Sequence, residues 1–100
     1  MAVRIPIDRE AIADFCRRNH ITRLALFGSV LRDDFGSDSD LDFLVEFDRS
    51  HVPGLLGLAG MEIELAEIVG RRVDMRTEED LSQYFRDQVV ASAHPLYVSR

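Results

Sequence analysis

The segment 41–47 constrains the fold most, because its apolar residues recur at every second position. These residues are Leu41, Phe43, Val45 and Phe47. Branched and aromatic residues at this period are typical of a β-strand with one buried face. Side chains on a strand alternate between faces, so Asp40 and Asp42 should project together from the opposite face. At about 6.6 Å spacing and an effective dielectric near 20, the two charges repel by about 2.5 kcal/mol, so we expect a positive group between them.

A second strand, expected over residues 72–77, carries a third acid. Val73 and Met75 would lie on one face and Asp74 on the other. If this strand neighbours 41–47, its carboxylate can join the first two. Three oxygen ligands with open positions suit Mg²⁺, which keeps waters and completes its shell with substrate phosphates. The sequence therefore predicts a cation site made by Asp40, Asp42 and Asp74.

Gly28-Ser29 follows an aliphatic segment, 21–27, that we interpret as the first strand. A helical turn is expected at 30–34, so free backbone N–H groups would point at whatever lies above it. Glycine permits close approach of a phosphate, and the Ser29 hydroxyl adds a donor. This junction predicts a cradle for a triphosphate that shares the cation of the three acids.

The remaining segments are interpreted from caps and periodicity. A helix should begin at Asp8 and end at Asn19, with Ile12, Phe15 and Cys16 facing inward. A second helix should run from Gly54 to Gly70 on the apolar residues Leu55, Leu58, Met61, Leu65, Ile68 and Val69.

The carboxyl-terminal part of the chain predicts one more helix and an extended end. Thr77 and Asp80 resemble a capping box, followed by a helix that carries Leu81, Phe85, Gln88 and Val89. Residues 35–39 read as a loop, and 94–98 as extended chain. We expect an α/β (α+β) fold, a small mixed sheet with helices packed on its apolar face.

Length and charge limit the classes of function. One hundred residues make one domain, 1–100, without room for a separate domain to hold an acceptor. The formal net charge of −6 disfavours direct binding of nucleic acid. All 12 basic residues are Arg, which excludes a lysine covalent intermediate.

Cysteine content and hydropathy bear on the compartment. Cys16 is the only cysteine, so the chain has no internal disulfide and no thiolate zinc site. The first residues lack an apolar export core, and no apolar run is long enough to span a bilayer. We expect a cytoplasmic protein without membrane partners.

The motif as a whole resembles a known family. Gly28-Ser29, ten residues, then Asp40-Leu41-Asp42 is similar to the signature of the minimal nucleotidyltransferase family, part of the polymerase-beta-like nucleotidyltransferase superfamily. The similarity extends to 70–74, which resembles the family's third-carboxylate strand, and to 95–97. Asp33 departs from the pattern, because the family often has glycine there after the arginine.

The resemblance implies the fold of that superfamily and transfer of a nucleoside monophosphate, here AMP from ATP, to a hydroxyl with release of pyrophosphate. It implies Asp40 and Asp42 as Mg²⁺ ligands and Asp74 as a third ligand that also activates the acceptor hydroxyl. Gly28 and Ser29 match the phosphate-binding pair. Two metal ions holding the attacking and leaving oxygens in line explain a need for three carboxylates.

Some of these residues also have simpler interpretations. Arg32 is a candidate phosphate ligand, or it pairs with Asp34 or Asp38. Ser39 is a candidate nucleotide-binding residue, and Asp38, Ser39 and Asp40 also suit Asx turns before a strand.

The resemblance also implies a partner. Many family members are antitoxins encoded beside an all-helical HEPN ribonuclease, and some adenylylate one of its tyrosines. Two other functions stay open: a catalytically silent module that neutralises a helical partner by occlusion, and an enzyme that modifies a small molecule. The residues do not indicate which base is preferred.

Overall fold

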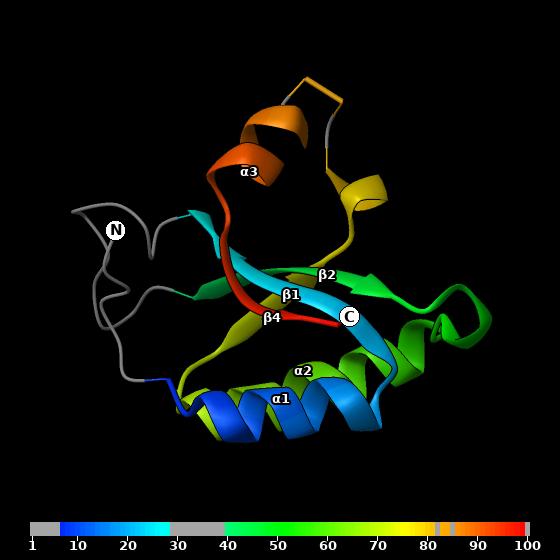
Figure 1. Ribbon diagram of the computed structural model, residues 1–100, viewed down its shortest axis with the longest axis vertical. Helices are drawn as coiled ribbons and strands as arrows, with labels where there is room; N and C mark the ends of the chain where they lie inside the picture. Colours follow the sequence, from blue (N-terminus) through cyan, green and yellow to red (C-terminus); the bar gives the residue numbers. More distant parts are fainter. Residues whose placement is uncertain (1–6, 29–39, 82, 85, 100) are drawn as a thin grey trace.

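Four strands form a mixed sheet in the order β3-β2-β1-β4 (Figure 1). The computed structural model describes residues 7–28, 40–81, 83, 84 and 86–99. The strands are β1 (Ile21–Phe27), β2 (Leu41–Phe47), β3 (Val73–Arg76) and β4 (His94–Val98). β1 pairs antiparallel with β2 and β4, whereas β2 and β3 are parallel. The three expected strands are thus confirmed, and the expected extended chain at 94–98 forms the fourth strand. The turn at 30–34 and the loop at 35–39 lie outside the described residues.

Two helices, α1 (Arg9–Arg18) and α2 (Leu55–Val69), cover one face of the sheet (Figure 1). The core lies between them and the sheet, and its largest fully buried side chains include Phe15, Phe43, Leu24, Leu26 and Leu65. A shorter helix, α3 (Arg86–Ser92), lies on the other side of the sheet. The predicted mixed sheet with an apolar face under helices is confirmed. None of the described helices is long and apolar enough to cross a membrane.

Helix α1 forms as its sequence predicts. The Asp8 carboxylate accepts a hydrogen bond from the Ala11 N–H at 3.1 Å, which satisfies a free donor of the first turn. Ile12, Phe15 and Cys16 are fully buried. At the other end of the helix, the Arg18 guanidinium lies 2.6 Å from Glu64 of α2, so an ion pair also joins the two helices.

The buried thiol of Cys16 should be unreactive in the folded protein. Burial raises the pKa of Cys16 to about 12, because a thiolate there would lose its hydration. Labelling by iodoacetamide at pH 8 should therefore be at least about 100-fold slower in buffer than in guanidinium chloride. Fast labelling of the native protein, at the rate of the unfolded chain, would show that α1 does not pack as described.

Helix α2 is confirmed at both ends, with one exception in its apolar stripe. It follows Gly54 and stops at Gly70, whose φ of 72° is the left-handed conformation expected of a helix-ending glycine. Leu65 is buried, and Leu58, Met61, Ile68 and Val69 pack against the core. Leu55 was expected to pack with them, and this is wrong: it is 86% exposed. The first turn of α2 begins beyond the strand ends, where no core is available to cover it (Figure 1).

The capping box was correctly placed, but it begins a shorter element than expected. The Asp80 carboxylate accepts the Thr77 N–H at 3.1 Å, and the turn that follows is the 3₁₀ helix η3 (Glu78–Asp80). Leu81 then has extended backbone angles, so the expected continuous helix is interrupted and α3 starts only at Arg86. Phe85 lies outside the described residues.

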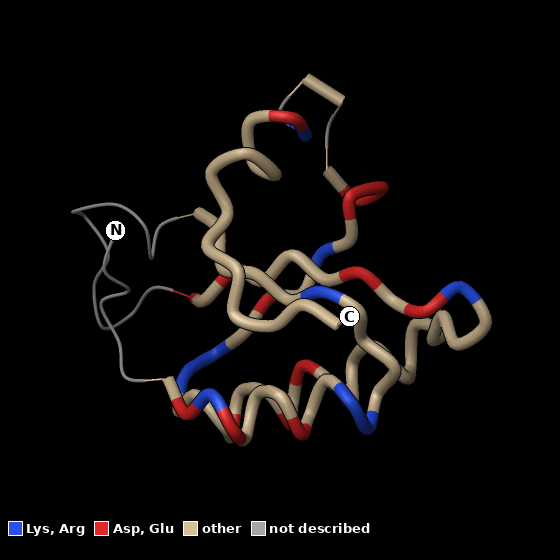
Figure 2. The backbone as a smooth tube through the Cα atoms, viewed as in Figure 1, with Lys and Arg blue, Asp and Glu red and all other residues tan. Residues whose placement is uncertain are grey.

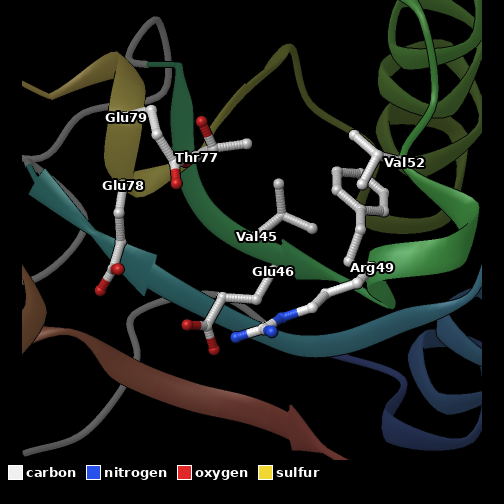
Figure 3. A pocket seen from close by; sticks show the side chains of 8 residues that line it. Val45, Glu46, Arg49, Val52, Thr77, Glu78 and Glu79 are labelled. Atoms are coloured by element: carbon white, nitrogen blue, oxygen red, sulfur yellow. The ribbon is translucent and has the colours of Figure 1, made fainter.

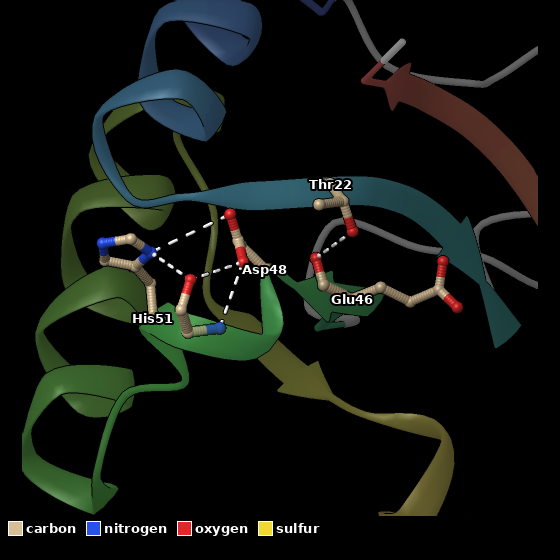
Figure 4. Close-up of polar contacts among 5 residues, drawn as sticks. Thr22, Glu46, Asp48 and His51 are labelled. Carbon is tan, nitrogen blue, oxygen red and sulfur yellow. Dashed lines mark hydrogen bonds and ion pairs between the residues drawn. The ribbon is translucent and has the colours of Figure 1, made fainter.

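A polar turn closes the far end of β2 (Figure 4). Asp48 accepts hydrogen bonds from the Ser50 N–H at 3.1 Å and the Ser50 hydroxyl at 2.9 Å, which lower the pKa of the Asp48 carboxyl. These bonds start the 3₁₀ helix η2 (Arg49–His51). The rings of His20 and His51 stack with centroids 3.7 Å apart. The turn fixes the exit of β2, away from the acids at its beginning.

Candidate active site

The pairing of β2 with β3 brings two of the predicted acids together. Asp42 lies directly opposite Asp74 in the parallel register, so both side chains project from the same face of the sheet. Leu41 and Phe43 are buried on the other face, under the helices. The expectation that the two strands are neighbours is confirmed.

Asp40 immediately precedes β2 and is exposed. The Leu41 N–H beside it donates to the Arg72 carbonyl at 2.9 Å, which extends the β2–β3 pairing to this end of the sheet. By strand alternation Asp40 belongs to the face of Asp42 and Asp74. The backbones of all three acids therefore lie at one end of the sheet, and their side chains project from the same face.

Glu62 of α2 anchors the strand that carries Asp74. Its carboxylate Oε2 accepts the Met75 N–H at 2.7 Å, a charge-assisted bond of the kind that contributes about 1.5–3 kcal/mol. β3 is an outer strand of the sheet, with a neighbouring strand on one side only. The Glu62 carboxylate therefore supplies an acceptor for the backbone N–H of Met75. The sequence analysis did not single out Glu62, because the bond depends on how α2 packs beside β3.

Gly28 ends β1 against the carboxylate of Asp42. Its φ is +79°, which side-chain-bearing residues rarely adopt. A Cβ at this position would collide with Asp42 Oδ2 and lie 3.3 Å from Asp42 Cγ. The backbone conformation therefore favours glycine, and a side chain at this position would displace the Asp42 carboxylate. Ser29, Arg32 and Ser39, the other predicted nucleotide-binding residues, lie outside the described residues.

Two arginines, Arg72 just before β3 and Arg76 at its end, occupy the same face as the acids. Arg72 Nε lies 3.1 Å from Asp40, and Arg76 Nε lies 3.0 Å from Asp74. Figure 2 shows this alternation of basic and acidic residues along β3. The sequence predicted positive charge near the acids but assigned it to a cation alone. The spacing of Arg72, Asp74 and Arg76 by two residues was the signal that could have indicated these pairs.

The three carboxylates fit a divalent cation in chemistry and in placement, although not in their present side-chain positions. Within the described parts of the chain, no group of three or more His, Cys, Asp or Glu residues lies close enough to hold a metal ion. The competing arginine pairs are exposed, and such pairs contribute only about 0–1 kcal/mol. A cation bound with a triphosphate could displace them, and Asp40, Asp42 and Asp74 would be its ligands.

Comparison with known proteins gives relatives in sequence and in fold. The profile of the nucleotidyltransferase domain family matches residues 9–95. MJ0435 of Methanocaldococcus jannaschii, named provisionally as a protein adenylyltransferase, is 32% identical over 76 residues, which are 76% of this chain and 80% of that protein. A solved structure named provisionally as a minimal nucleotidyltransferase is 39% identical, with a TM-score of 0.72 and 87% of both chains covered.

A more distant similarity is to a chain in a solved complex. The structure of tri-AMPylated Shewanella oneidensis HEPN toxin with MNT antitoxin matches with a TM-score of 0.63 and 22% identity. The match covers 91% of this chain and 70% of that one. At this identity the match shows a shared fold.

Proposed function

Because this chain belongs to the nucleotidyltransferase domain family, and is a nucleotidyltransferase of the minimal type, we propose that it transfers AMP from ATP to a hydroxyl of a partner protein. The observation that carries the proposal is the placement of Asp42 opposite Asp74, with the Gly28 backbone against the Asp42 carboxylate. Pyrophosphate would leave as the new phosphodiester forms. We further propose that residues 1–100 act as one domain in the cytoplasm.

Each residue of the site would have one role, in binding the metal ions, binding the nucleotide or activating the acceptor. Asp40, Asp42 and Asp74 would hold Mg²⁺, two ions in this proposal, which neutralises charge on the triphosphate. Gly28 lets the backbone lie close against the Asp42 carboxylate, and Gly28, Ser29, Arg32 and Ser39 would form the nucleotide site. Asp74 is on the outer strand β3, where an acceptor can approach from beyond the sheet. Its carboxylate would take the proton of the acceptor hydroxyl as that oxygen attacks the α-phosphorus.

The proposed acceptor is a tyrosine of a HEPN-type helical toxin, with this chain as the antitoxin in a hetero-oligomer. This rests on the resemblance of the motif and on the complex of HEPN toxin with MNT antitoxin to which the chain is similar. The net charge of −6 favours a basic protein as partner. Occlusion of such a partner without chemistry is the alternative.

The test is transfer of label from α-³²P-ATP to the helical protein encoded beside this one. With Mg²⁺, label should appear on that protein and should resist removal by gel electrophoresis in denaturant. With EDTA in place of Mg²⁺, labelling should stop. Suppression of toxicity without any labelling, under every nucleoside triphosphate tried, would favour occlusion instead.

A further inference from the structure

A cleft opens where β3 ends and β2 continues. The last β3 residue, Arg76, pairs with Leu44, so the stretch 45–47 of β2 extends past its neighbour. The cleft there has a volume of about 460 Å³. Its lining comes from β2, η2 and η3 and consists of Val45, Glu46, Phe47, Arg49, Val52, Thr77, Glu78 and Glu79.

The lining of this cleft combines apolar surface with excess negative charge. Val45, Phe47 and Val52 supply the apolar part, and Val52 is 66% exposed. The charged residues of the lining are three glutamates, Glu46, Glu78 and Glu79, and one arginine, Arg49, which Figure 3 shows on β2, η3 and η2. Across the described residues, none of these three carboxylates forms an ion pair. With three glutamates and one arginine, the lining of the cleft carries a net charge of −2.

Strand β2 connects the cleft with the predicted cation site, because it carries both Glu46 and Asp42. Glu46 follows Asp42 by four residues on the same face of β2, so their backbones are roughly 13 Å apart. Asp42 is paired with the outer strand β3 and Glu46 lies just past the end of that strand, on the side from which an acceptor would approach Asp74. A polypeptide held in the cleft could therefore reach the acids without crossing the sheet.

We propose that this cleft docks a segment of the acceptor protein that presents a lysine or arginine next to an apolar side chain. The inference rests on the proposed function and adds how the acceptor is held. Charge complementarity selects this occupant: a triphosphate would be repelled by the three glutamates, and a second copy of this chain carries a net charge of −6. The apolar lining would cover the stem and neighbour of the basic residue.

The first experiment measures binding without chemistry. The affinity for the helical protein encoded beside this one is determined by calorimetry, without nucleotide, for the wild type and for Glu78→Arg/Glu79→Arg. The matched control is Glu10→Arg/Glu67→Arg, which makes the same change in net charge at exposed acids of α1 and α2 outside the cleft. A further variant, Val52→Asp, tests the apolar lining.

The cleft variants should bind at least tenfold more weakly, and the control should stay within about threefold of the wild type. In the transfer assay, the KM for the acceptor should rise while the KM for ATP stays unchanged. An arginine or lysine of the partner changed to glutamate should restore binding to Glu78→Arg/Glu79→Arg.

Three results would overturn the proposal: no binding by the wild type, equal weakening by control and cleft variants, or full affinity in the cleft variants. Failure of the cleft proposal can be distinguished from failure of the proposed enzymatic function. Loss of binding in the cleft variants together with no transfer by the wild type would support the cleft and contradict the enzyme. Transfer by the wild type, with an acceptor KM that the cleft variants leave unchanged, would support the enzyme and contradict the cleft.

Discussion

Replacing Asp42 by Asn should lower kcat for nucleotidyl transfer by about 10³-fold, or roughly 4 kcal/mol of transition-state stabilisation. Asp42 has the central position of the site, opposite Asp74 in the register and against Gly28. The amide keeps the shape of the carboxylate but removes the charge that would hold a cation. The measurement is the initial rate of labelling of the acceptor protein at saturating ATP and Mg²⁺.

The control for Asp42→Asn makes the same chemical change elsewhere. Asp14→Asn removes an exposed carboxylate of α1 that pairs with Arg18, and it should leave kcat within twofold of the wild type. Both variants should unfold thermally within a few degrees of the wild type. A fully active Asp42→Asn protein would remove this residue from the catalytic machinery.

Replacing Gly28 by Ala should lower both stability and transfer. The left-handed φ of +79° costs a residue with a Cβ about 1–2 kcal/mol, and the added methyl must push the Asp42 carboxylate out of position. Because a misplacement of about 1 Å can cost on the order of 100-fold in rate, we expect a loss of that size in kcat. Denaturant unfolding and the labelling assay measure the two effects separately.

Variants of two other glycines distinguish the effect of backbone strain from the effect of a clash with Asp42. Gly70 also has a positive φ, 72°, but an added Cβ there meets nothing within 4 Å, so Gly70→Ala should lose stability and keep its activity. Gly54, the N-cap of α2, has a φ of −78° and equally open surroundings, so Gly54→Ala should lose only about 1 kcal/mol or less and keep its activity. Equal loss of activity in Gly28→Ala and Gly70→Ala would contradict a specific role for the space beside Asp42.

Features encoded by adjacent residues were predictable from the sequence. The Asp8 cap and the buried stripe of α1 depend on spacing within one helix, and the face shared by Asp40 and Asp42 depends on alternation within one strand. The stops at Gly28 and Gly70 follow from the backbone freedom of glycine. These signals sufficed for the order of the strands and main helices and for the face shared by Asp40 and Asp42, whereas the approach of Asp74 depended on the pairing of β2 with β3.

Features that depend on contacts between distant segments were not predictable. The bond from the Met75 N–H to Glu62 joins α2 to β3 across thirteen positions of the chain, and the Arg72–Asp40 pair requires the parallel register of β2 and β3. Leu55 fits the apolar period of α2 but lies beyond the sheet that would cover it. The cleft beside Glu46 exists because β3 is shorter than β2, which periodicity did not indicate.

The most direct measurement is a crystal structure of the protein soaked with Mn²⁺ and a non-hydrolysable ATP analogue, read by the anomalous signal of manganese. We expect manganese within about 2.5 Å of carboxylate oxygens of Asp42 and of at least one of Asp40 and Asp74, shared with the phosphates. Arg72 and Arg76 should then have released Asp40 and Asp74. Manganese bound to phosphate alone, with both arginine pairs intact, would contradict a shared cation site.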